Sequence, residues 1–411
     1  MSAGRVRVAV TGMGVKCPAG TSAEEAFATV LAARPTAAAV PLLAAAGLPV
    51  RIACLVPPFD VEPYIGRREL RQIDRTTALL LCAADDALAD ARLPEGVPAH
   101  RVGVHVGTGV GGLPSMEDVT RRHGDRPAAM PVHTVPKTMA NSPACRLAMR
   151  HGFHGSCLTY STSCASGANA IGEAARRIRY GELDVAVAGG VDAPVTPVVV
   201  GGFTRMRALS PRNDAPELAS RPFDADRDGF VIGEGAAVLV LERWDLAVAR
   251  GARIHGEVAG YAATCDGSHI VAPRPDGALA AACMREALAD AGLAPGAVGH
   301  VNAHGTSTVL NDRAEAVAVA RCFGAAAPPL TSVKGVTGHL IGGSGAVEAV
   351  VALLSAERGV VPPVATTTAT PDAAGLDVVL GAPRRVARRP VLSNSFGFGG
   401  QNACLVLSPA R

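Results

Sequence analysis

The chain has 411 residues, long enough for two domains or for one large domain with a substantial buried core. Apolar residues make up 48% and aromatic residues only 3%, so the core must be built from Ala, Val, Leu and Ile. The net charge of +3, with acids and bases interspersed, gives no case for bulk nucleic-acid binding. Uncharged stretches are broken by Ser, Gly, Asn and Pro, which excludes a membrane span, and the charged N-terminus has no signal-peptide core. We therefore expect a soluble cytoplasmic protein.

Short β-prone runs alternate along the chain with Ala-rich amphipathic stretches. The predicted strands include residues 5–14, 101–109 and 184–192, and the predicted helices include residues 78–93, 166–181 and 278–293. This alternation is typical of α/β layers.

Two short motifs recur in the same order in the two parts of the sequence. ALADARL at 87–93 returns as ALADAGL at 287–293, and STSCASGAN at 161–169 is echoed by SNSFGFGGQN at 393–402. We therefore predict two similar halves, residues 1–250 and residues 251–411. A functional site would lie where these halves meet.

A glycine loop follows one predicted strand. Gly107, Gly109 and Gly112 match G-x-G-x-x-G, the fingerprint of a dinucleotide site. However, residues 113–131 are polar and interrupted by Pro, and no following strand is expected to end in the acidic residue that would hold a ribose. We expect no nucleotide site here.

Ten cysteines are spread along the chain. No pair has C-x-x-C spacing and no Cys/His cluster suits zinc, so a metal site or a disulfide framework is improbable. Most of these thiols are expected to be buried small side chains.

Cys164 has a different context, because it lies between a β-prone segment and a predicted helix. The partial positive charge of a helix N-terminus lowers the pKa of a thiol and favours the thiolate. The backbone N–H of Cys164 could also face a developing oxyanion. These features suit a nucleophile, but alone they leave a buried structural cysteine as the alternative.

Three further loops carry reactive or glycine-rich groups. His304 lies in NAHGTST (302–308), and Lys334 and His339 lie in SVKGVTGHLIGGSGAVEAV (332–350), where Glu348 is the nearest acid for the lysine. The glycines of SNSFGFGGQN could present backbone N–H groups to an oxyanion. Acyl transfer through a thioester needs a nucleophile, groups that transfer protons and donors for an oxyanion. A cysteine, two histidines and a glycine-rich loop can supply these groups. Two neutral imidazoles suit the stabilisation of an enolate oxygen.

The motifs STSCASG, NAHGTST, VKGVTGHLIGGSGAVE and NSFGFGG together resemble those of the β-ketoacyl-acyl carrier protein synthases. The likeness is greatest to the elongating synthases and to the type II polyketide ketosynthases, and it extends to SRPFDADRDGFVIGEGAAVLVLE at 220–242. The resemblance implies a thiolase-like α/β fold, with two βαβαβαββ halves in five α-β-α-β-α layers. It also implies a homodimer or a heterodimer with a chain-length-factor subunit, and an acyl carrier protein (ACP) as partner. No cofactor is expected, because the substrates are carried on the phosphopantetheine of the ACP.

The resemblance also implies a role for each residue that matches a family motif. Cys164 would be the nucleophile that takes an acyl group, and His304 and His339 would bind the malonyl thioester and assist its decarboxylation. Lys334 paired with Glu348 would order the histidine loops. The backbone N–H groups of Cys164 and Phe398 would form the oxyanion hole, and Phe398 would gate the acyl pocket.

Further positions are expected to bind substrate, to support the site or to dock the carrier. The expected substrate-binding residues are Thr306, Thr308, Val110, Thr134 and Phe396, and structural hydrogen bonds are expected from Asp312 and Glu315. Basic residues expected to meet the acidic carrier protein are Arg67, Arg68, Arg71, Arg205, Arg207 and Arg212, with solvated surface charge as the alternative.

The sequence departs from the family pattern at three positions. Val271 and Ala272 stand where Thr and Ser are frequent, which removes hydroxyls that could contact phosphopantetheine, and Thr134 stands where an aromatic residue is common.

The pathway in which the protein acts has two nearly equal interpretations. These are primary fatty-acid elongation and dedicated polyketide or polyene assembly, with a slight preference for the second. The alternative from another class is a non-catalytic chain-length-factor-like subunit, which the presence of Cys164 disfavours. A thiolase is disfavoured because Cys404 is out of place for a second catalytic cysteine.

Overall fold

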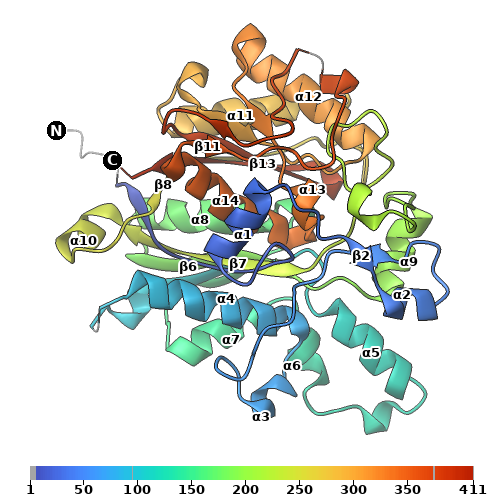
Figure 1. Ribbon diagram of the computed structural model, residues 1–411. Helices are drawn as coiled ribbons and strands as arrows, with labels where there is room; N and C mark the ends of the chain where they lie inside the picture. The colour runs from blue at the N-terminus through green and yellow to red at the C-terminus, as the bar shows by residue number, and fades with distance from the viewer. Residues whose placement is uncertain (1–5, 95, 374, 411) are drawn as a thin grey trace.

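The computed structural model describes residues 6–94, 96–373 and 375–410 (Figure 1). Ten strands of this part of the chain form one sheet in the order β10-β9-β13-β14-β8-β1-β7-β6-β4-β5. Their bounds are β1 Val8–Lys16, β4 Val102–Gly107, β5 Cys157–Tyr160, β6 Val185–Asp192, β7 Gly235–Arg243, β8 Gly256–Cys265, β9 His300–Asn302, β10 Leu330–Thr331, β13 Val391–Gly397 and β14 Gln401–Pro409. Two short hairpins, β2 Ala38–Ala39 with β3 Ile52–Ala53 and β11 Val360–Val361 with β12 Arg384–Arg385, lie outside this sheet.

The sheet consists of two matching parts. The order β1-β7-β6-β4-β5 in the first part corresponds to β8-β14-β13-β9-β10 in the second, and the parts join where β1 pairs antiparallel with β8 at Ala9 and Glu257. Including the main helices, the first part follows β1-α4-β4-α7-β5-α8-β6-β7 and the second follows β8-α11-β9-α12-β10-α14-β13-β14. The duplicated βαβαβαββ arrangement implied by the resemblance is therefore confirmed.

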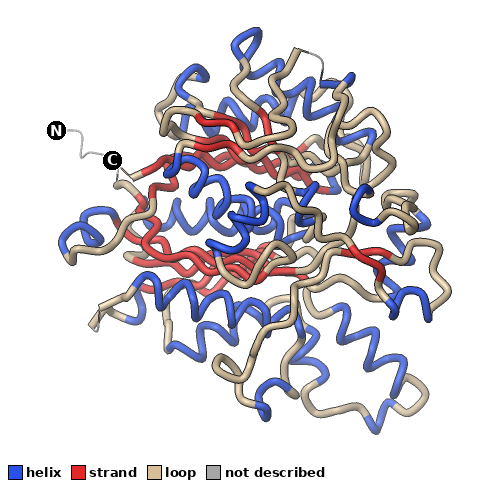
Figure 2. The backbone as a smooth tube through the Cα atoms, in the orientation of Figure 1, coloured by secondary structure: helices blue, strands red, loops and turns tan. Residues whose placement is uncertain are grey.

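Helices separate and cover the two parts of the sheet. The longer helices are α1 Ala23–Leu31, α4 Arg75–Ala91, α5 Leu113–His123, α7 Ser142–His151, α8 Ser166–Arg179, α9 Pro197–Arg205, α11 Ala278–Asp290, α12 Val309–Phe323 and α14 Ser344–Arg358. The shorter ones are α2 Pro41–Ala45, α3 Arg67–Leu70, α6 Thr134–Thr138, α10 Trp244–Ala249 and α13 Lys334–Thr337. Figures 1 and 2 show five layers, with α4 and α7 on one outer face, α8 and α14 between the sheet parts, and α11 and α12 on the other outer face.

The two central helices pack closely because their facing residues are small. Gly167 lies so near the loop before α14 that an added Cβ would be 2.7 Å from the oxygen of Gly342. An added Cβ on Gly345 would likewise be 2.9 Å from the nitrogen of Ala168. Small side chains thus replace the large apolar groups that the sequence lacks. They bring the N-terminal ends of α8 and α14, and the loops that precede them, into contact.

The structure confirms the six elements predicted from hydrophobic pattern and differs in one segment. Residues 113–131, a polar segment interrupted by Pro, include the helix α5, which is not among the predicted helices. Pro114 is accommodated because it occupies the first turn, where its missing N–H leaves no hydrogen bond unmade. Among the described residues, no helix has the length and apolar character needed to cross a membrane.

Candidate active site

Cys164 is presented by a sharp turn between β5 and α8. A single turn of 3₁₀ helix, Ser163–Ala165, leads into α8, and Ser163 adopts a left-handed conformation with φ of 52°. The Ser166 hydroxyl accepts a hydrogen bond from the Thr162 N–H at 2.9 Å and donates to the Ser163 carbonyl at 2.6 Å. These bonds fix the turn so that the Cys164 side chain points into the protein and is only 6% exposed.

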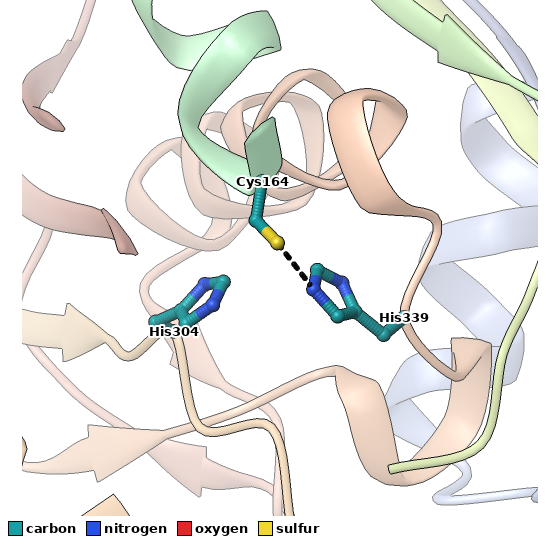
Figure 3. A group of neighbouring side chains, drawn as sticks. All are labelled: Cys164, His304 and His339. Atoms are coloured by element: carbon teal, nitrogen blue, oxygen red, sulfur yellow. Dashed lines mark hydrogen bonds between the residues drawn. The ribbon is translucent and has the colours of Figure 1, made fainter. Parts of the chain in front are cut away.

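His339 comes from the second half of the chain and meets Cys164 directly. Its Nε2 atom lies 3.0 Å from the Cys164 Sγ atom (Figure 3). Its Nδ1 atom lies 2.9 Å from the hydroxyl oxygen of Ser344, which also accepts the Leu340 N–H. The Ser344 hydroxyl can accept the Nδ1 proton as well, and in that tautomer Nε2 is free to accept the thiol proton.

His304 completes the group from the loop after β9. Its Nδ1 atom lies 3.3 Å from the Lys334 Nζ atom, which also donates to the His304 carbonyl and pairs with the Glu348 carboxylate. Because the lysine is a donor, Nδ1 accepts and the ring proton of His304 lies on Nε2. The ring centroids of His304 and His339 lie 5.3 Å apart. The Cys164 sulfur and one ring nitrogen of each histidine all lie within 4.8 Å of one another.

The backbone around His304 is held by two buried carboxylates. Glu315 accepts the N–H groups of His304 and Gly305 at 2.8 and 2.7 Å. Asp312 accepts the N–H groups of Thr306 and Ser307 at 2.9 and 3.1 Å. The structural hydrogen bonding expected of both acids is present, and so is the expected Lys334–Glu348 ion pair.

Burial keeps both histidines neutral. Burial and the charge of Lys334 hold the pKa values of His304 and His339 well below 6.5, and each histidine is at most 3% exposed. At neutral pH His304 therefore presents an imidazole N–H, and His339 presents an imidazole acceptor in the tautomer with its proton on Nδ1.

The thiol differs from the sequence-based expectation. Burial raises the pKa of Cys164 to about 12, and the charge of Lys334 and the Phe398 N–H lower it only in part. The expectation of a lowered pKa at the helix start was wrong for this closed site, because the cost of desolvating a thiolate exceeds the effect of the helix terminus. Cys164 is thus a neutral thiol, and His339 Nε2 lies within hydrogen-bond distance of its sulfur.

A cavity of about 380 Å³ leads to these three residues. Of the residues expected to contact substrate or to gate the pocket, Thr306, Thr308, Phe396 and Phe398 line it. Val271 and Ala272, the positions without hydroxyls, also line it, and so does Arg207. The backbone N–H groups of Phe398 and Cys164 lower the pKa of the Cys164 thiol, so they lie close to its sulfur. Their role as an oxyanion hole remains a prediction.

Two expected substrate-binding residues lie elsewhere. Val110 and Thr134 are not among the residues that line this cavity. Thr134 begins α6, and its hydroxyl donates to the Pro131 carbonyl at 2.7 Å. The Val110 N–H binds the Asp192 carboxylate at 3.1 Å. Their contact with substrate remains a prediction.

The expected docking arginines form two separate groups. Arg67, Arg68 and Arg71 lie on or beside α3, and Arg205 and Arg207 lie at the end of α9, which is well apart from α3 in Figure 1. Arg67 pairs with Glu62, and Arg212 pairs with Asp228. Their docking role remains a prediction.

Sequence reasoning missed three residues around the site. Ser344 orients His339, Phe230 places its ring 5.3 Å from the His339 ring, and Asp192 binds the glycine loop 107–112. Asp192 could have been singled out from the sequence, because it is an acid at the end of an otherwise apolar predicted strand. The strand that directly follows this loop, β5, ends in Tyr160, and Asp192 is the last residue of the next strand, β6. This acid binds the N–H groups of the loop itself, where a phosphate would bind in a dinucleotide site.

The donor set could also hold a soft divalent metal. Zn²⁺ prefers thiolate and imidazole ligands, and Cys164, His304 and His339 would supply one ligand atom each. Spacing along the chain gave no sign of this set, since its members come from three distant loops.

The chain is similar to proteins of one known family. Residues 5–247 match the family model "Beta-ketoacyl synthase, N-terminal domain" and residues 255–368 match "Beta-ketoacyl synthase, C-terminal domain". The chain is 40% identical to 3-oxoacyl-[acyl-carrier-protein] synthase 2 of Synechocystis sp., over 97% of each chain.

Two solved structures are similar over nearly the whole fold. The ishigamide ketosynthase/chain length factor is 34% identical with a TM-score of 0.91. A type II PKS ketosynthase, bound to the hexaketide and in complex with its acyl-carrier protein, is 30% identical with a TM-score of 0.91. Each comparison covers 99% of this chain and 100% of the other. The fold is thus the thiolase-like fold that the sequence motifs imply, and the chain belongs to the β-ketoacyl synthase family.

Proposed function

We propose that the protein is a 3-oxoacyl-ACP synthase that condenses an acyl group held on Cys164 with a malonyl group carried by an ACP. The observation that carries the proposal is the buried group of Cys164, His304 and His339 at the end of the cavity. A chain-length-factor-like subunit without catalysis has no need of a thiol in contact with an imidazole acceptor.

The first step loads the acyl group. The Cys164 sulfur attacks the thioester carbonyl of acyl-ACP while its proton passes to His339 Nε2, 3.0 Å away. The carbonyl oxygen becomes an oxyanion that accepts the N–H groups of Cys164 and Phe398. The carbon–sulfur bond to the carrier then breaks, and the carrier thiolate takes the proton back from His339. The products are acyl-Cys164 and free ACP thiol.

The second step forms the carbon–carbon bond. The malonyl thioester carbonyl accepts a hydrogen bond from His304 Nε2–H, and the bond to the carboxylate carbon breaks with release of carbon dioxide. Because His304 is neutral and Lys334 fixes its tautomer, the N–H is directed at the enolate oxygen that develops. The enolate carbon attacks acyl-Cys164 and the carbon–sulfur bond breaks, which leaves a Cys164 thiolate. This thiolate takes up one proton from solvent through His339, so each turnover consumes one proton. The product is a 3-oxoacyl-ACP.

The partners follow from the shape of the cavity and from the relatives. The cavity is mostly apolar and is lined in part by Thr306 and Thr308, which suits a phosphopantetheine arm. Solved ketosynthases similar to this chain are bound to an acyl-carrier protein or paired with a chain length factor, which supports an ACP and a second subunit as partners. No separate cofactor enters the two steps.

The test is a condensation assay with octanoyl-ACP and malonyl-ACP, followed by mass spectrometry of the ACP products. The wild-type protein should release carbon dioxide and form 3-oxodecanoyl-ACP, and Cys164→Ala should form none while keeping its thermal unfolding midpoint. Condensation by Cys164→Ala at the wild-type rate would overturn the proposal.

A further inference from the structure

Asp192 is a buried acid beside the active site that the reaction above does not use. It is the last residue of β6 and is 0% exposed. Its carboxylate accepts four hydrogen bonds, from the Thr108 hydroxyl at 2.6 Å and from the N–H groups of Gly109, Val110 and Gly342 at 2.7, 3.1 and 2.7 Å. Burying a carboxylate costs free energy, and the four donors that contact Asp192 are neutral. The carboxylate is therefore expected to hold these four groups in position.

These four bonds join the two halves of the chain. Thr108, Gly109 and Val110 follow β4 in the first half, whereas Gly342 follows His339 in the second. The packing leaves no space for side chains here. An added Cβ on Gly342 would lie 2.5 Å from the Gly109 nitrogen and 2.7 Å from the Asp192 Oδ2 atom. Gly109 of the 107–112 loop is therefore explained by its close approach to Ile341 and to this carboxylate, whereas Gly107 and Gly112 approach the backbone of Ser166 and of Thr138.

The segment held by Asp192 forms a wall of the cavity. Ile341 lines the cavity next to Cys164 and lies two residues after His339. Its φ is 51°, a left-handed conformation that is strained for a β-branched residue and persists only where neighbouring contacts hold it. The bond from the adjacent Gly342 N–H to Asp192 is such a contact. Ile341 also packs on the first-half loop, since an added Cβ on Gly109 would lie 2.6 Å from its Cγ2 atom.

We propose that Asp192 is a positioning residue that fixes the Ile341 wall against the Gly109–Val110 loop and thereby determines which acyl chains Cys164 accepts. The inference rests on the proposed function. Acyl chains long enough to pass Ile341 should depend on this wall, whereas an acetyl group, which ends near the sulfur, should not.

The test measures self-acylation of Cys164 by intact mass, with acetyl, octanoyl and dodecanoyl thioesters of N-acetylcysteamine as probes. Asp192→Asn keeps the size of the side chain but turns an amide group toward two of the four donors. We expect its octanoyl-to-acetyl rate ratio to fall about tenfold, since a small displacement of a positioning wall costs rate steeply. The expected change lies mainly in the KM of the longer thioesters.

Two more variants separate positioning from a purely structural role. Thr108→Val removes one donor with little change in shape and should shift the same ratio in the same direction, by a smaller factor. Asp224→Asn is the matched control. Asp224 is a buried carboxylate that accepts the N–H groups of Thr368 and Asp226 but does not line the cavity. It should leave the ratio unchanged even if stability falls.

The outcomes are distinct. An equal loss for all three chains in Asp192→Asn, or an unchanged ratio, would overturn the positioning role. If Asp192→Asn does not fold, the octanoyl-to-acetyl rate ratio of Thr108→Val is used instead. An unchanged ratio, or an equal loss of rate for all three chains, would again overturn the positioning role. Failure of the wild-type protein to acylate Cys164 with any thioester would instead overturn the proposed function.

Discussion

The Cys164 Sγ and His339 Nε2 atoms lie 3.0 Å apart, although 175 positions separate the two residues in the chain. The contact forms because the two central helices pack through small residues, which brings the loops before α8 and α14 together. The active site is thus a consequence of the joined halves. Each prediction below disturbs one part of it.

The Lys334–Glu348 pair is buried, with each side chain 1% exposed. Lys334→Met would leave the Glu348 carboxylate unpaired and should cost about 3–5 kcal/mol of unfolding free energy, because a lone buried charge is penalised strongly. The double variant Lys334→Met/Glu348→Leu should recover much of that stability, as measured by urea unfolding. Neither variant should decarboxylate malonyl-ACP at the wild-type rate, since His304 loses the donor that sets its tautomer. A double variant no more stable than Lys334→Met would contradict this account of the pair.

Acid should destabilise the protein through its neutral histidines. The pKa of His304 in the folded protein is held well below 6.5 by burial, Lys334 and His339, whereas the unfolded chain binds a proton below about pH 6.5. The unfolded state then binds more protons, so stability falls as pH falls through this window, by up to about 1.4 kcal/mol per pH unit for each such histidine.

Urea unfolding of the wild-type protein and of His304→Asn, at neutral pH and at about pH 5, checks this dependence. The asparagine variant should lose less stability on acidification than the wild-type protein, and a variant of the exposed His100 should follow the wild-type curve. Equal losses in wild type and His304→Asn would contradict a neutral buried His304.

The cavity mouth lacks two hydroxyls that substrate could use. Val271 and Ala272 line the cavity, and restoring hydroxyls there with Val271→Thr/Ala272→Ser should lower the KM for acyl-ACP about fivefold, within the range for one or two added hydrogen bonds. The kcat should stay unchanged because the reacting atoms are not touched. Ile270→Thr, at an exposed position outside the cavity lining, is the matched control and should leave KM unaltered. An equal change of KM in the control and in the double variant would show that these two positions do not contact substrate.

A soft divalent metal should compete with the acyl donor for the active-site group. Zn²⁺ should slow self-acylation at least about tenfold, and EDTA should restore it, because a cysteine and two histidines within 4.8 Å match its ligand preference. Mg²⁺ at the same concentration should have no effect, since it prefers oxygen ligands. Inhibition that persists in full in His304→Asn would show that the metal binds elsewhere.

Much of the fold could be read from the sequence because the pattern is duplicated. The strands ending near Gly107 and Asp192 and the helix after Cys164 follow from apolar runs and Ala-rich periodicity, and the repeated motifs indicated two halves. The helix α5 was missed because its polar sequence lacks a continuous apolar face, and its starting Pro114 was taken as an interruption rather than as a first-turn residue.

The site was predictable in its members but not in its electrostatics. Cys164, His304 and His339 stand out because each lies in a loop rich in small residues. The pKa of Cys164 depends on burial, which local sequence does not reveal, so the helix terminus alone gave the wrong direction. The Asp192 contacts were missed for a related reason, since they join loops more than 80 residues apart that only the packed structure brings together.

Mass-spectrometric mapping of the acyl group tests the central claim most directly. After brief incubation with octanoyl-ACP, the wild-type protein should gain one octanoyl group, and peptide mapping should place it on Cys164. The matched variant Cys164→Gln should gain none, yet it should still release carbon dioxide from malonyl-ACP because His304 and His339 remain in place. An octanoyl group on any other residue, or an undiminished gain in Cys164→Gln, would contradict the account.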